Sequence, residues 1–73
     1  MYAELSVSEA EKMLLKIRKI GKYHENARFL ATEIMSDLRN AERNLHVLEE
    51  DEIRRLKEKI AVIRKEVMEF KIL

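Results

Sequence analysis

The chain of 73 residues has no cysteine, no proline, no tryptophan and a single glycine, Gly21. Without cysteine it can form neither disulfides nor thiolate-based zinc sites. The two histidines, His24 and His46, are too few for an imidazole metal cage. A domain this small buries only a little over half of the surface that its unfolded chain exposes, so its core is marginally stable. Regular helix packing and self-association remain as ways to stabilise it.

An excess of charge of one sign is also missing, because 15 basic and 14 acidic side chains leave a net charge of +1. A dedicated nucleic-acid binder carries a surplus of cations that neutralise phosphates. No apolar run approaches the ~18 residues that span a bilayer. The first residues, MYAELSVSEAEK, carry acids where a signal peptide needs a basic stretch and an apolar core. We therefore expect a soluble cytoplasmic protein that makes no membrane contact.

Amides are scarce, since glutamine is absent and asparagine occurs only at positions 26, 40 and 44. Glu, Lys, Arg, Ile and Leu dominate instead. This composition is typical of thermophile proteins, which favour ion-pair networks and avoid thermolabile amides.

Strand signals are missing as well, and strong helix formers fill most of the chain. Ser6 stands three residues before Glu9, and Ser8 three before Glu11, and either pair can form a capping box. The first helix is therefore expected to begin near residue 8, with Leu5 packing on its first turn. The sequence predicts an all-α fold.

Apolar residues then recur in alternating steps of three and four, which is the heptad spacing of helices that pack along a seam. The series runs through positions 10, 13, 17, 20, 24, 27, 31, 34, 38, 41, 45 and 48, with His24 as its one polar member. It keeps its phase through Gly21, which favours one helix over about 8–48. The alternative is a break at Gly21, because cations before a glycine often end a helix and Asn26 could cap a new one.

A second break is predicted at about 49–51, where the apolar series jumps from Leu48 to Ile53. The four acids at 49–52 suit the N-terminus of a helix, whose peptide dipoles attract negative charge, and Asp51 is the expected cap. A coiled-coil stutter is the alternative. The last helix should cover about 52–72, so that residues 1–73 form a single helical domain.

Two arms of this kind form an antiparallel helical hairpin that cannot enclose a core alone. The predicted architecture is therefore a homodimer of two hairpins in a four-helix bundle; the alternative, with a break at Gly21, is a three-helix bundle. The expected oligomer interface consists of the stripe residues Ile17, Ile20, His24, Ala27, Ala31, Ile34, Leu38, Leu45, Ile53, Leu56, Ile60, Ile63 and Val67.

His24 is expected to lie in this seam and fix its register, with a pH-sensitive contact between subunits as the functional alternative. Glu42 and Glu49 flank His46 at helical spacing, but the Glu-x-x-His pattern of di-iron bundles is absent. No metal site, cofactor site or catalytic site is predicted. Phe29, on the side opposite the seam, is either an anchor for a partner or, after a break at Gly21, part of the core.

Basic residues cluster in the segments KIRKIGK and RRLKEK, and dimerisation would double each cluster. The leading functional prediction is a small structural or protein–protein interaction module that associates with itself, and it can include another helical protein as partner. The alternative is a nucleic-acid-associated accessory or regulatory protein, and a small bundle enzyme ranks third. The candidate nucleic-acid contacts are Lys12, Lys16, Lys19, Lys22, Arg54 and Arg55.

Overall fold

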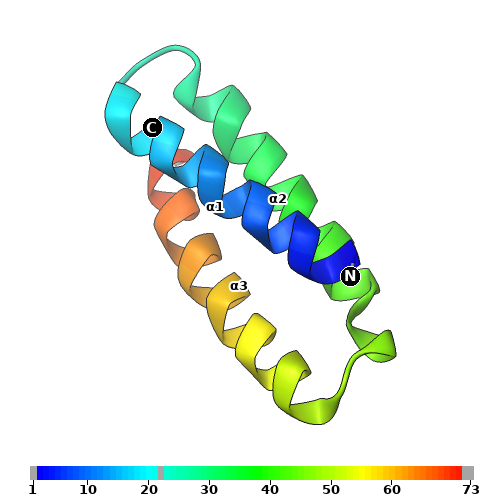
Figure 1. The fold of residues 1–73 in the computed structure, drawn as a ribbon. Coiled ribbons are helices and arrows are strands. Elements are labelled where there is room, and N and C mark those ends of the chain that lie inside the picture. Colours follow the sequence, from blue (N-terminus) through cyan, green and yellow to red (C-terminus); the bar gives the residue numbers. More distant parts are fainter. Residues whose placement is uncertain (1, 22, 72–73) are drawn as a thin grey trace.

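The computed structural model describes residues 2–21 and 23–71, and it confirms the all-α prediction. Across these residues the chain forms three α-helices, α1 (Tyr2–Ile20), α2 (Ala27–Arg43) and α3 (Glu50–Lys71), a 3₁₀ turn η1 (Leu45–Val47), and no strand. The helices run up, down and up, so that α1 and α3 are parallel and α2 is antiparallel to both (Figure 1). Together they form an elongated bundle of 39 × 17 × 17 Å.

Helix α1 begins at Tyr2, about six residues earlier than expected. Ala3 and Val7 are buried and extend the apolar stripe backward from Ala10. The predicted start near residue 8 is wrong because burial of this extra turn stabilises helix ahead of both capping boxes. Ser6 accordingly lies inside the helix and is itself buried.

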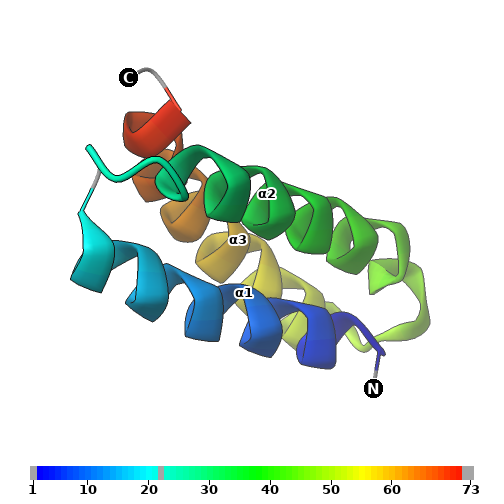
Figure 2. The same cartoon turned by 90° about the horizontal axis from the view of Figure 1, so that it is seen from above.

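The predicted continuous helix over 8–48 is wrong, since α1 ends at Ile20. Gly21 adopts a positive φ of 80°, and its N–H donates to the carbonyl of Ile17 at 3.0 Å. Only glycine adopts this left-handed conformation freely, and it is a common way to end a helix. The chain then turns back within a few residues, and α2 starts at Ala27 (Figure 2).

Helix α2 packs most extensively on α1, and its contact with α3 is the next most extensive. The small side chains Ala27, Ala31 and Ala41 are fully buried on the face that also carries Ile34 and Leu38. Alanines at these positions let neighbouring backbones approach closely, while the larger residues fill the space between them.

Helix α2 ends at Arg43, earlier than the predicted 48, and a short turn leads into α3. The side-chain amide of Asn44 donates to the carbonyl of Asn40 at 2.8 Å, which satisfies one of the free carbonyls at the helix end. Leu45 and Leu48 are buried and anchor the turn to the core. Helix α3 starts at Glu50, so the predicted cap Asp51 instead lies in the acidic first turn.

Helix α3 completes a core that closes within one chain. The expectation that one copy could not bury its apolar helix faces is therefore corrected, because the break at Gly21 supplies a third helix. Buried side chains from every helix meet along the bundle axis: Val7, Leu14 and Ile17 of α1, Ile34 and Leu38 of α2, and Leu56, Ile60, Ile63, Val67 and Phe70 of α3.

Candidate functional site

Most residues of the predicted oligomer interface are buried inside the single chain. This holds for Ile17, Ala27, Ala31, Ile34, Leu38, Leu45, Leu56, Ile60, Ile63 and Val67, whereas Ile53 is half-buried and Ile20 is partly exposed. In this fold a second copy cannot reach the buried members. The predicted choice of interface residues is thus corrected. The stripe forms the core of one chain, because the chain turns back after Gly21 and packs one part of the stripe against another.

His24 does not lie in a seam, and this prediction is wrong. It is exposed in the turn between α1 and α2, where its Nδ1 accepts a hydrogen bond of 3.0 Å from the backbone N–H of Asn26. The imidazole thus satisfies a donor ahead of α2, in the way that capping side chains do.

The candidate nucleic-acid contacts are distributed over separate places. Lys16 and Lys19 line a hollow beside Ile20 and Phe29, and Lys12 lies 3.7 Å from the carboxylate of Glu9. Arg54 and Arg55 belong to the first turns of α3 and line three other hollows. The sixth candidate, Lys22, lies outside the described residues. The described candidates therefore form two groups, one on α1 and one at the start of α3.

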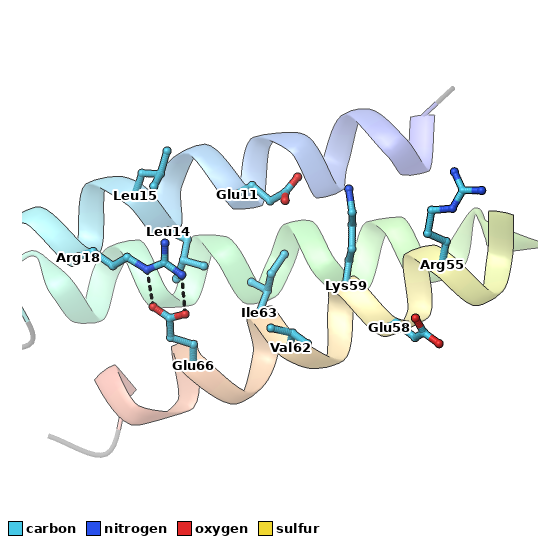
Figure 3. A pocket seen from close by; sticks show the side chains of 10 residues that line it. All are labelled: Glu11, Leu14, Leu15, Arg18, Arg55, Glu58, Lys59, Val62, Ile63 and Glu66. Atoms are coloured by element: carbon cyan, nitrogen blue, oxygen red, sulfur yellow. Dashed lines mark hydrogen bonds and ion pairs between the residues drawn. The ribbon is translucent and has the colours of Figure 1, made fainter.

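A groove of about 460 Å³ runs between α1 and α3, the two helices that contact each other least (Figure 3). Its floor is apolar, since Leu14 and Ile63 are nearly buried there. Leu15 of α1 and Val62 of α3 stand on the two rims and are 56% and 68% exposed. An apolar strip therefore crosses the middle of an otherwise charged groove.

Charged side chains flank this strip on both sides. At one end the guanidinium of Arg18 donates two hydrogen bonds, of 2.6 and 2.7 Å, to the carboxylate of Glu66. These bonds lower the pKa of Glu66 below its usual range and raise that of Arg18. Toward the other end lie Glu11 and Lys59, from the same two helices.

The complete lining carries as many acids as bases, with Glu11, Glu58 and Glu66 against Arg18, Arg55 and Lys59. A lining without net charge does not favour a strongly acidic or strongly basic ligand. It is suited to a surface whose charges are equally mixed.

A second ion pair, from the same turn of α3, ties this helix to α2. Arg64 donates to both carboxylate oxygens of Glu42, at 2.6 and 3.2 Å, and these bonds lower the pKa of Glu42. Glu42 is one of the carboxylates beside His46 that could have served a metal. Within residues 2–21 and 23–71, no group of three or more histidine and carboxylate side chains could hold a metal ion.

Asp37 of α2 is a carboxylate with a raised pKa. Partial burial is the main cause, followed by repulsion from Glu9 and Glu33.

The sequence prediction missed three of the four apolar groove residues. It placed position 13 on the stripe, whereas Leu14 is buried, and it left Leu15 and Val62 off the stripes. The available signal was the step of four from Ala10 to Leu14, which continues the stripe of Ala3 and Val7.

Among the described residues, the helices include none with the length and apolarity needed to cross a membrane. Comparison of the chain with protein-family models, with curated proteins and with solved structures finds no match. The α1–α3 groove is therefore interpreted from its own geometry.

Proposed function

We propose that this chain is a small cytoplasmic protein–protein interaction module that associates with itself through the α1–α3 groove. The observation that carries the proposal is the pair of exposed apolar rims, Leu15 and Val62, above an apolar floor. Covering this strip with a second copy removes apolar surface from water, which stabilises the complex by about 25 cal/mol per Å². We assign the chain a binding role and no catalytic role.

A second copy is favoured as the occupant because the groove lining is electrically neutral. Its three acids and three bases can be matched by an equal set, which an identical groove supplies. Two grooves placed face to face bring α1 and α3 of both copies together as four helices. The predicted dimeric four-helix bundle is thus proposed in an altered form, in which each α2 lies outside the four-helix contact.

Sedimentation equilibrium from about 10 μM to about 1 mM tests this proposal, since this range brackets weak association. We expect a reversible monomer–dimer equilibrium. Leu15→Lys places a charge on the apolar strip and should weaken the dimer by at least about tenfold, or about 1.4 kcal/mol.

Phe29→Lys is the matched control, because Phe29 is 65% exposed on α2, outside the groove. It should leave the association unchanged. A protein that stays monomeric throughout the range contradicts self-association, and equal effects of the two substitutions contradict the groove as its site.

Nucleic-acid binding is the second candidate, and the hollow beside α1 favours it. There Lys16 and Lys19 stand next to the aromatic ring of Phe29, a combination that can hold a phosphate and stack a base. Binding of a single-stranded oligonucleotide that weakens steeply with salt, and that is lost in Lys16→Glu/Lys19→Glu, would support this function. Binding that does not depend on salt would exclude it.

A further inference from the structure

On each helix that lines the groove, the charged side chains change sign from one end to the other. The order of the signs along α1 is opposite to that along α3. On α1, Glu11 precedes Arg18 by seven residues; on α3, Lys59 precedes Glu66 by seven. Seven residues are close to two helical turns, so both members of a pair project from the same side of their helix. From N- to C-terminus, α1 therefore runs from acid to base and α3 from base to acid.

The two charge reversals lie at the same level of the bundle. The midpoint between Glu11 and Arg18 falls between positions 14 and 15, and the midpoint between Lys59 and Glu66 falls between 62 and 63. These midpoints are 48 positions apart. The hydrogen bonds from Arg18 to Glu66 also join residues 48 apart, so they mark the alignment of α1 with α3. One line across the groove, through the apolar strip, passes both midpoints.

We propose that the groove binds the groove of a second copy in antiparallel orientation, about a twofold axis along this line. The inference rests on the proposed self-association and adds its geometry. In this arrangement α1 lies against α1 of the partner, and Glu11 faces Arg18 of the partner subunit. On α3, Lys59 faces Glu66 of the partner subunit. The apolar rims Leu15 and Val62 meet their own copies at the axis.

A further pair of charges follows the same symmetry. Arg55 and Glu69 are each seven residues from Val62, on the same side of α3, and both are exposed. Among the described side chains, neither takes part in an ion pair within the chain. In the antiparallel dimer, each Arg55 faces Glu69 of the partner subunit, so that both residues gain an opposite charge.

A parallel arrangement also matches Glu11 with Lys59, but it brings the first turns of the two α3 helices together. Each first turn carries Glu50, Asp51 and Glu52, so six acids would gather at one end. All helix dipoles of the contact would also point the same way. The antiparallel arrangement places these turns at opposite ends of the dimer, and like charges stay apart.

Engineered cysteines test the axis directly, because the natural chain has none. Val62→Cys places a thiol on the axis, where two copies can form a disulfide. Under mild oxidation, followed on a non-reducing gel, we expect this variant to cross-link at least about tenfold faster than Phe29→Cys, because the dimer raises the effective thiol concentration. Equal rates for the two variants would overturn the arrangement.

Charge reversal tests the orientation without cysteine chemistry. Arg55→Glu alone, or Glu69→Arg alone, places like charges opposite each other twice per dimer. Each should weaken association several-fold in sedimentation equilibrium. The double variant Arg55→Glu/Glu69→Arg restores opposite charges only if the helices are antiparallel, and its affinity should return to the natural level. A double variant as weak as the two single variants combined would exclude this orientation.

Failure of this inference can be told apart from failure of the proposed function. A natural chain that remains monomeric removes both. A dimer that Leu15→Lys weakens, but that neither cross-links at position 62 nor recovers in the double variant, keeps the function and removes the antiparallel geometry.

Discussion

At the scale of single residues, Gly21 sets the direction of the chain. Its positive φ lies in a region where the Cβ of an L-residue meets the neighbouring carbonyl. Apart from its two chain neighbours, no residue would approach a Cβ built on Gly21 within 4 Å. The requirement for glycine therefore comes from the backbone conformation alone and not from a lack of space.

Gly21→Ala should destabilise the folded chain by about 1 kcal/mol, the usual cost of a left-handed backbone for alanine. Gly21→Asn should cost less, since asparagine tolerates this conformation better. Urea unfolding of the three proteins measures the difference. An alanine variant as stable as the natural chain would mean that the helix does not end at residue 21.

Asp37 is a residue at which charge opposes folding. Burial and repulsion raise its pKa, so the folded chain binds the proton more tightly than the unfolded chain, and ionisation at rising pH lowers stability. Asp37→Asn should therefore raise the free energy of unfolding at neutral pH by up to about 0.5 kcal/mol. The gain should fade as the solution becomes acidic enough to protonate Asp37.

Unfolding in urea at neutral and at acidic pH measures this difference. Glu25→Gln, in the exposed turn before α2, is the control for loss of one negative charge. If that control stabilises the protein equally, a general charge effect accounts for the result and the local burial of Asp37 does not.

At the scale of elements, α3 is held to both of its neighbours by ion pairs from one turn. Glu66 binds Arg18 of α1, and Arg64 binds Glu42 of α2, each through two hydrogen bonds. Pairs with two hydrogen bonds have a defined geometry and are stronger than single contacts. They fix how α3 is aligned along the bundle, while the apolar core determines which face it presents.

These pairs should make stability depend on pH in the acid range. Both carboxylates have a folded pKa below the ordinary value, so their contribution is complete above the unfolded pKa near 4.5 and is lost as pH falls through the lower folded pKa. Glu42→Gln/Glu66→Gln should be less stable than the natural chain at neutral pH. Its stability should also fall less as the pH is lowered.

Thermal unfolding followed by circular dichroism from pH 7 to pH 2 measures this slope. A double-mutant cycle on Arg64 and Glu42 should give about 0.2–1 kcal/mol, the usual range for a largely exposed pair. If the stability of the double glutamine variant falls with decreasing pH as steeply as that of the natural chain, neither pair contributes.

The type of these elements was predictable from sequence, but their connection at Gly21 was not. The apolar stripe has the same spacing on both sides of Gly21 whether the helix continues or turns back. In both cases the same residues face a neighbouring helix. Helix propensity could not distinguish a continuous helix from a break either, since glycine within a helix costs only about 1 kcal/mol. The two arrangements differ in the free energy gained when a third helix buries its apolar face. That gain depends on contacts between distant parts of the chain. Leu14 was missed for a related reason: Met13 and Leu14 fit the spacing equally well until α3 is in place.

At the scale of the whole molecule, the core is complete within one chain, and what remains for a partner is a surface groove. A dimer of this kind joins subunits that are already folded, unlike an interlocked pair of hairpins. Its contribution to the stability of each subunit is limited to the free energy of a weak contact.

The midpoint of thermal unfolding should therefore depend only weakly on protein concentration. Between about 5 μM and about 500 μM we expect a rise of no more than about 5 °C, since a change of 1 kcal/mol shifts the midpoint of a domain this size by roughly 4–8 °C. Circular dichroism in cells of different path length covers this range. A much larger rise would indicate that folding requires association, as in the hairpin dimer.

The placement of both ion pairs at Arg64 and Glu66 makes the two halves of α3 unequal. Its C-terminal half is held by charges as well as by apolar packing, whereas its N-terminal end follows a turn that is anchored by buried leucines, Leu45 and Leu48. Added salt screens charges but not apolar contacts. High ionic strength should accordingly speed amide exchange first in the C-terminal half of α3, where both ion pairs lie.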